Sequence, residues 1–212
     1  MSNSLTPITS TVRPVRPQDP ASVWRSLCWV TDRIAVSGDL PRDPAAALDQ
    51  LRHWEENGIT HEIDVRFEAN DGRFVHAHSA ISYANFGVDD DGGTRDPEWF
   101  DAVVEHALEV LRNDADARIV VHCHLGVNRA PSVVFALMLA LGWEALPALR
   151  RIRNVRPISG IIYAADAVEW HGLRSGLDDE EIDAAVTQVV AWFARNPLDL
   201  SWVIRTLHRR LA

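Results

Sequence analysis

The segment from Ala117 to Gly142, ARIVVHCHLGVNRAPSVVFALMLALG, constrains the fold more than any other part of the chain. It begins with a β-branched run that ends at Cys123, passes through a short loop containing a glycine, and enters an almost wholly apolar stretch near Arg129. A β-branched run without polar alternation is typical of a parallel strand that helices cover on both faces. The segment therefore predicts a buried strand, a tight loop and a buried helix at the centre of an α/β domain.

Shorter patterns on either side of this segment repeat the alternation of strand and helix. Apolar periodicity, N-cap residues and terminal glycines delimit the elements. Strands are predicted within 34–37, 59–67 and 84–88, a turn at 68–74, and helices within 44–57, 97–111, 145–155 and 161–173. The expected fold class is α/β, a sandwich with a central, mostly parallel sheet flanked by helices and followed by a C-terminal helical extension.

Composition shifts divide the chain into three parts. Residues 1–21 are rich in proline, serine and threonine, which predicts a flexible or extended N-terminal arm. Residues 22–175 carry the strand and helix alternation and form the expected catalytic domain. Residues 176–212 contain two amphipathic patterns, which predict a pair of helices that packs on the main body or forms a homo-oligomer contact.

Charge and composition exclude several classes of function. The net charge is −9, and all 21 basic residues are arginines, so neither a lysine Schiff base nor a Walker-type phosphate loop is available. An acidic chain lacks the basic face of a nucleic-acid binder. No apolar run approaches the length of a membrane span, the start lacks the apolar core of a secretory signal, and two cysteines imply no disulfide framework. We therefore expect a cytoplasmic enzyme without nucleic-acid or membrane partners.

The cysteine that ends the central strand is placed for nucleophilic chemistry. Helix N-termini and nearby cations stabilise a thiolate, and the loop after Cys123 must curl over the start of the next helix. Gly126 permits a close approach or a positive φ in that curl. The guanidinium of Arg129 matches two oxygens of a phosphate. The sequence thus predicts that a sulfur nucleophile and an anion site coincide.

The stretch HCHLGVNR resembles the His-Cys-x-x-Gly-x-x-Arg signature of cysteine-dependent protein phosphatases, specifically their dual-specificity branch. The resemblance extends over roughly residues 30–172. It implies a hydrolase that acts through a phosphocysteine formed on Cys123 and needs no cofactor. It also implies that His122 has a supporting role, in which it orients the loop backbone and stabilises the thiolate. The implied phosphate-binding loop consists of His124, Leu125, Gly126, Val127, Asn128 and Arg129.

The resemblance also implies a general acid on a loop after a short strand, which falls in the acidic triplet 89–91. The spacing to Phe100 selects Asp90 as the catalytic acid, while Asp89 and Asp91 stay open and a solvated acidic turn is the structural alternative. The substrate that follows is a phosphorylated protein, with phosphotyrosine first and phosphoserine or phosphothreonine as further candidates.

Two loop positions depart from the family pattern. Ala130 replaces the usual serine or threonine, whose hydroxyl assists breakdown of the phosphocysteine, so we expect a slow second step. Asn128 stands where serine is frequent and is found in some RNA triphosphatases of the superfamily. The loop also lacks the extra basic residues expected for polyphosphorylated inositides.

The same residues allow other functions and other roles. A catalytically weak or inactive phosphate-binding module of the same fold is the alternative function, and sulfur transfer uses a similar loop. A zinc site at His122, Cys123 and His124 is disfavoured, because three adjacent residues cannot all face one ion, so we expect no metal. The pair His76 and His78 is assigned to a solvated loop. The remaining interpretations make Cys28 a buried structural thiol and leave Arg156 as a phosphate contact or a turn anchor.

Overall fold

The computed structural model describes residues 12–211, apart from the side chains of residues 210 and 211. The first eleven residues of the predicted arm lie outside the described residues. Among the described residues, no helix is both long enough and apolar enough to cross a bilayer.

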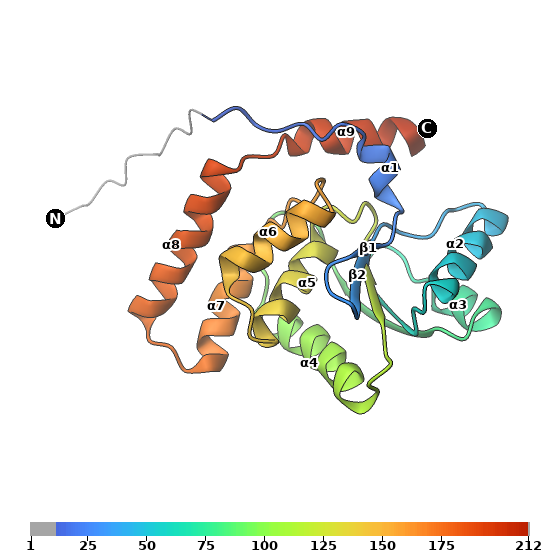
Figure 1. Cartoon of the computed structure of the whole chain (residues 1–212), viewed down its shortest axis with the longest axis horizontal. Coiled ribbons are helices and arrows are strands. Elements are labelled where there is room, and N and C mark those ends of the chain that lie inside the picture. Colours follow the sequence, from blue (N-terminus) through green and yellow to red (C-terminus); the bar gives the residue numbers. More distant parts are fainter. Residues whose placement is uncertain (1–11, 212) are drawn as a thin grey trace.

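A five-stranded sheet forms the centre of the molecule, in the order β1-β2-β5-β3-β4 (Figure 1). The strands are β1 (Cys28–Trp29), β2 (Ile34–Ser37), β3 (His61–Arg66), β4 (Ser82–Val88) and β5 (Ile119–His122). β1 pairs antiparallel with β2, and the other pairs are parallel. β5 lies between β2 and β3, so the strand that ends at the candidate nucleophile is the middle strand of the sheet. The predicted mostly parallel α/β architecture is confirmed.

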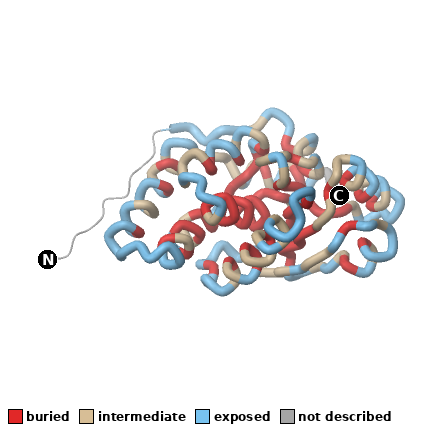
Figure 2. The backbone as a smooth tube through the Cα atoms, turned by 60° about the horizontal axis from the view of Figure 1, so that its bottom comes forward, coloured by how far each residue is buried: buried red, intermediate tan, exposed pale blue. Residues whose placement is uncertain are grey.

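Strict alternation along β2, β3 and β5 sends side chains to two separate cores. Ile63 and Val121 face one core, which is filled by α4 (Pro97–Asn113), α5 (Arg129–Ala140), α6 (Ala145–Val155) and α7 (Ala164–Ser175). Ala35 and Val120 face the other core, against α2 (Pro44–Glu56) and α3 (Gly72–His78). Figure 2 shows that buried backbone is concentrated in the middle of the molecule and exposed backbone at its rim.

The assignment of His76 and His78 to a solvated loop was wrong, since both belong to α3. The turn predicted at 68–74 is correspondingly shorter, because α3 begins at Gly72. The helix has seven residues, too few to show helical periodicity in the sequence. It is stabilised by burial of Val75 against α2 and by contacts of Phe74 with the same core. Tertiary packing therefore decides its structure.

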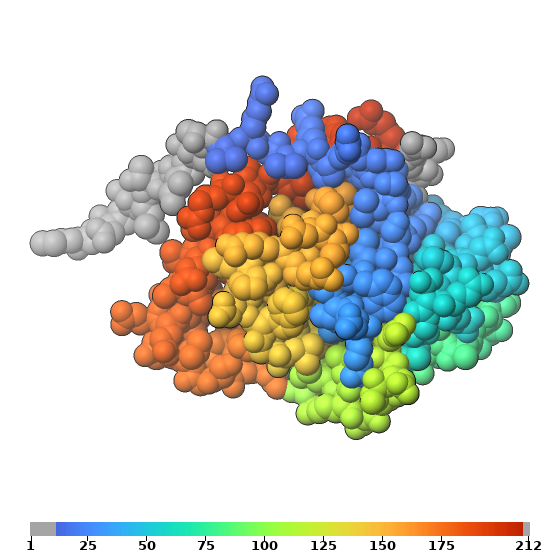
Figure 3. Space-filling model, viewed as in Figure 1, coloured from blue at the N-terminus to red at the C-terminus, as the bar shows by residue number. Residues whose placement is uncertain are grey.

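The C-terminal region forms two helices that pack on the body. α8 (Asp179–Arg195) begins with a capping box between Asp178 and Glu181 and lies against α7. α9 (Leu200–Leu211) lies against the short helix α1 (Pro20–Trp24) at the opposite end of the chain. Figure 3 shows the N-terminal and C-terminal segments side by side on one edge of the molecule. The division into an arm, a catalytic domain and an extension stays our proposal.

Candidate active site

The 124–129 loop connects β5 to α5 and turns its carbonyl oxygens outward. The carbonyls of residues 124–127 each accept a hydrogen bond from a group outside the loop. The donors are the Trp24 indole and the Asp39 amide to His124, the Arg156 guanidinium to Leu125 and Gly126, and the Gly160 amide to Val127. The amides of residues 125–128, in contrast, donate to no acceptor within the described chain. Because the carbonyls face outward, the amides face the inside of the curl and form an anion nest.

Gly126 is the residue that makes this curl feasible. Its φ is 60°, in the left-handed region that favours glycine. A Cβ at this position would clash with the guanidinium of Arg156 and with the backbone carbonyl of Ser37. The predicted need for glycine in this loop therefore has both a conformational and a steric cause.

Arg156 supports the loop from behind and does not face the pocket. Its side chain is fully buried, and Nε donates to the carbonyl of Gly126 at 2.7 Å. Nη2 donates to the carbonyl of Trp24 at 2.7 Å, and Nη1 contacts the sulfur of Cys28 at 3.4 Å. Arg156 was predicted to be either a phosphate contact or a turn anchor, and the geometry fits an anchor. It holds the 124–129 loop and the segment that contains Trp24 and Cys28. Cys28 is buried beside it, as expected for a structural thiol.

Cys123 lies at the floor of a pocket of about 390 Å³. The pocket is lined by the 124–129 loop, by the 90–92 segment, by Ile162 and by three side chains of α9. Cys123 itself is 1% exposed. A ligand atom that reaches this sulfur therefore has to enter the ring of loop amides.

Arg129 presents one edge of its guanidinium to this pocket. A guanidinium carries five N–H donors, of which two bind Glu68 and a third binds the carbonyl of Val88. The two that remain belong to Nε and Nη2, which share one edge of the planar group. Nε has no hydrogen-bond partner among the described residues and lies 3.5 Å from Oδ2 of Asp90. This edge is suited to two oxygens of a tetrahedral oxyanion.

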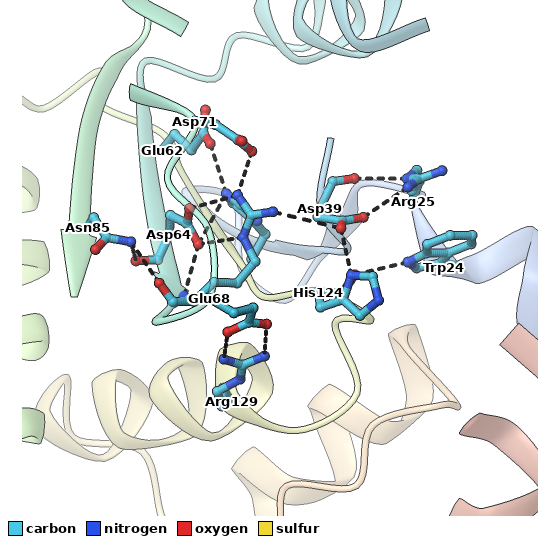
Figure 4. Close-up of polar contacts among 12 residues, drawn as sticks. Trp24, Arg25, Asp39, Glu62, Asp64, Glu68, Asp71, Asn85, His124 and Arg129 are labelled. Atoms are coloured by element: carbon cyan, nitrogen blue, oxygen red, sulfur yellow. Dashed lines mark hydrogen bonds and ion pairs between the residues drawn. The ribbon is translucent and has the colours of Figure 1, made fainter. Parts of the chain in front are cut away.

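Glu68 holds the opposite edge of Arg129, as Figure 4 shows. Both Nη···Oε distances are 2.7 Å. The hydrogen bond from Arg129 keeps the pKa of Glu68 below its ordinary value, and the contact in turn raises the pKa of Arg129 against the effect of burial. Glu68 follows β3 and was not singled out in the sequence.

The acidic triplet separates into three environments. Oδ1 of Asp90 accepts hydrogen bonds from the Asn128 amide at 2.6 Å and from the Tyr163 hydroxyl at 3.0 Å. Asp89 accepts from the backbone of its own turn. Asp91 pairs with Arg95, although it also borders the pocket. Among the three, Asp90 therefore has the carboxylate that lies against the loop and Arg129.

Asn128 and Tyr163 brace the segment that carries Asp90. Oδ1 of Asn128 accepts from the backbone of Ile162 at 2.6 Å, so its amide bridges the acidic segment and the 160–163 turn. Burial, followed by the nearby Asp90, raises the pKa of Tyr163 to about 12, which keeps its hydroxyl a donor at neutral pH. No sequence motif indicates the role of Tyr163.

His122 points away from the pocket, as alternation along β5 predicts. It is fully buried, and its Nε2 lies 2.8 Å from Oε1 of Glu62. Burial opposes the charged imidazolium, but the Asp64 carboxylate and the Glu62 contact outweigh it and raise the pKa of His122. Burial likewise raises the pKa of Glu62.

A buried ion-pair network continues from this pair to the rim of the loop. Nη2 of Arg66 lies 2.8 Å from Oδ2 of Asp64 and 2.5 Å from Oδ2 of Asp71, and Nη1 lies 3.7 Å from Oδ2 of Asp39. Asp39 in turn accepts from Nδ1 of His124 at 2.7 Å. The network ties the start of the loop to the ends of β2 and β3.

Three potential metal ligands, Glu62, Asp71 and His122, come within 4.8 Å of one another in this network. Arg66 already supplies a positive charge to Asp71, and a cation beside it would be repelled. The donor set is therefore better suited to the buried ion pairs than to a metal.

Comparisons with known proteins found relatives in sequence and in fold. No protein-family model matches the chain. The chain is 29% identical over 133 residues to the dual specificity protein phosphatase 13B of Mus musculus, covering 57% of this chain and 63% of that protein. It is 32% identical over 108 residues to the protein phosphatase Slingshot of Drosophila melanogaster, covering 50% of this chain and 10% of that protein. The chain thus spans less than two thirds of either relative.

Solved structures share the fold at low sequence identity. The active form of Tk-PTP has a TM-score of 0.58 at 16% identity, covering 71% of this chain and 99% of its own. A mouse putative dual specificity phosphatase complexed with zinc tungstate has a TM-score of 0.58 at 14% identity, covering 80% of this chain and 99% of its own.

In fold, the chain is similar to these phosphatase structures. In sequence, it is similar to a dual specificity protein phosphatase and to a second protein phosphatase. The resemblance expected from HCHLGVNR is therefore confirmed, and the chain is dual-specificity-phosphatase-like.

Proposed function

We propose that this chain is a cysteine-dependent phosphoric monoester hydrolase that removes phosphate from phosphotyrosine in proteins. Cys123 attacks phosphorus, an S–P bond forms and the bond from phosphorus to the phenolic oxygen breaks. Asp90 gives its proton to that oxygen. Asp90 then takes a proton from water, whose oxygen attacks phosphorus, and the S–P bond breaks to release inorganic phosphate and the thiolate.

One observation carries this proposal: the loop amides of residues 125–128 and Nε of Arg129 have no hydrogen-bond acceptor among the described residues, and the loop and Arg129 line the same pocket as Cys123. A phosphoryl group in transfer carries charge on three equatorial oxygens, and preorganised donors of this kind stabilise it. Asp90 borders the same pocket, on the side of Arg129 Nε. His122, buried with Glu62, has a supporting role and is not a base.

The test is phosphate release from matched phosphotyrosine, phosphoserine and phosphothreonine peptides. We expect release from the phosphotyrosine peptide, its abolition in Cys123→Ser, and a loss of about 10²–10⁴-fold in Asp90→Asn. Asp91→Asn is the matched control and is expected to remain active. A wild-type rate equal to that of Cys123→Ser on every peptide would replace this proposal with the phosphate-binding module.

The test also decides two finer points. Activity that survives in Asp90→Asn and is lost in Asp91→Asn moves the general acid by one position. Rates on phosphoserine or phosphothreonine peptides equal to those on phosphotyrosine broaden the substrate class.

The comparisons give no support to a homo-oligomer formed through the C-terminal helices, and we do not propose one.

A further inference from the structure

The C-terminal helix α9 forms one wall of the pocket above Cys123. Leu200, Ile204 and His208 recur at intervals of four residues, which places them on one face of the helix, and all three line the pocket. This wall comes from outside residues 30–172, where the sequence resembles the phosphatase family.

A neighbouring face of α9 fixes the helix to the body. Val203 and Leu207 are fully buried in a small core with Trp24, Ile158 and the loop residue Val127. Because Val127 belongs to the 124–129 loop, the same core supports α9 and the back of the anion nest. The wall is therefore positioned relative to Cys123 by direct packing.

The N-terminal segment contacts the start of α9 and holds it in place. Val15 pairs with Leu198 as a parallel bridge, and Asp199 accepts from Nε of Arg16 at 2.8 Å. The Asp199 carboxylate also accepts from the backbone of Trp202 at 3.0 Å, which caps the helix. Figure 1 shows this N-terminal stretch running beside α9.

Leu200 also packs against the 160–163 turn, which is linked to Asp90 through Asn128. A Cβ added at Gly160 would lie 2.9 Å from Cδ2 of Leu200, so the two segments are in close contact. The amide of Gly160 donates to the carbonyl of Val127, and Ile162 of the same turn lines the pocket. Helix, turn and loop thus enclose a single space.

Apart from the anion nest, the acidic residues Asp90 and Asp91 and the histidines His124 and His208, the lining of this space is mainly aliphatic. Leu125, Ile162, Leu200 and Ile204 contribute aliphatic residues to it. Leu200 and Ile204 are only partly buried, so they expose hydrocarbon that a flat aromatic leaving group would cover. The side chain of a phosphoserine is shorter and offers little apolar surface to these residues.

We propose that α9 is a substrate-selecting wall, whose Leu200 and Ile204 contact the leaving group and favour an aryl phosphate over an alkyl phosphate. This inference rests on the proposed function for its substrate, but its binding test does not depend on turnover. Leu200 and Ile204 are specificity residues in this account, and neither takes part in bond making.

The test measures binding of phenylphosphonate and methylphosphonate to full-length Cys123→Ser protein, in which no covalent step occurs. The two probes share the anion and differ in the apolar group. We expect tighter binding of phenylphosphonate, a loss of about 10-fold in that affinity in Ile204→Gln, and a change below about 2-fold for methylphosphonate. Leu200→Ala is a second variant with the same expectation. Ser201→Ala, on the exposed part of α9, is the matched control and is expected to change neither affinity.

Equal affinity for the two probes, or phenylphosphonate binding unaltered in both variants, would overturn the role of α9. A parallel loss of both probes in both variants would do the same, because it would show that α9 only supports the loop. Failure of the proposed function is separate: it appears as wild-type phosphate release no faster than in Cys123→Ser.

Discussion

The carboxylate of Glu68 contacts the guanidinium of Arg129 at two points, with Nη1···Oε2 and Nη2···Oε1 both 2.7 Å. This pairing occupies one edge of the guanidinium and turns the edge with Nε toward the pocket. The proposed phosphate contact thus depends on a residue that binds the arginine and is not among the residues lining the pocket above Cys123.

Replacing Glu68 tests that dependence. We expect Glu68→Ala to lower kcat/KM by about 10–100-fold, because Arg129 loses the partner that fixes its plane. Glu68→Gln retains one acceptor oxygen and is expected to lose less. Measured affinity for vanadate is expected to fall in the same order. Full activity in Glu68→Ala would show that the loop alone orients Arg129.

Tyr163→Phe tests the bracing of Asp90. The variant removes the hydroxyl that donates to Asp90 at 3.0 Å and keeps the buried ring. We expect kcat on a phosphotyrosine peptide to fall about 10-fold, the loss of one hydrogen bond to a charged group. An aryl phosphate with a strongly acidic phenol needs little proton donation and is expected to lose less. An equal loss on both substrates would contradict a role through the general acid.

Ala130→Ser tests the expected slow second step. Ala130 is fully buried in the first turn of α5 and offers no hydroxyl to the departing thiolate. We expect the wild type to show a burst of phenol release followed by a slow steady state, and Ala130→Ser to raise the steady-state rate and reduce the burst. Stopped-flow measurement of phenol release reports both phases. An unchanged steady state in Ala130→Ser would refute this interpretation of position 130.

The buried network predicts a dependence of stability on pH. Burial alone would raise the pKa of Asp64, but His122 and the bidentate contact with Arg66 outweigh it and lower that pKa. A carboxyl with a lower pKa in the folded state stabilises the protein above its unfolded pKa, near 3.9, and loses that contribution as the pH falls through the folded value. We expect the free energy of unfolding to decrease below about pH 4.

Asp64→Asn is the variant that isolates this contribution. It leaves Arg66 with a weaker buried partner and is expected to cost about 3–5 kcal/mol at pH 7. Denaturant titrations between pH 3 and 7 are expected to show a flatter pH dependence than in the wild type. Parallel curves for the two proteins would assign the acid sensitivity to other carboxyls.

Local sequence patterns predicted those elements whose structure is determined by residues close together in the chain. The β-branched run before Cys123 identified the middle strand, and Gly126 identified the curl, because both depend on residues close together in the chain. α3 was missed, since its stability comes from packing of Val75 against a distant helix.

Contacts between residues that lie far apart in the sequence could not be predicted from local patterns. Glu68 and Arg129 are separated by 61 positions, and Tyr163 and Asp90 by 73, so spacing carries no trace of either pair. The sequence shows that α9 is amphipathic. It does not show that one face of the helix packs on Val127 while the neighbouring face lines the pocket. The roles of Cys123 and the neighbouring residues stay predictions until they are tested.

The most direct test of the account is rapid-quench mass spectrometry of the wild-type protein mixed with a phosphotyrosine peptide. We expect a phosphate adduct on Cys123 that forms with the first turnover, accumulates because Ala130 offers no hydroxyl, and is absent from Cys123→Ser. Phosphate release at the wild-type rate with no adduct on Cys123 at any quench time would contradict it.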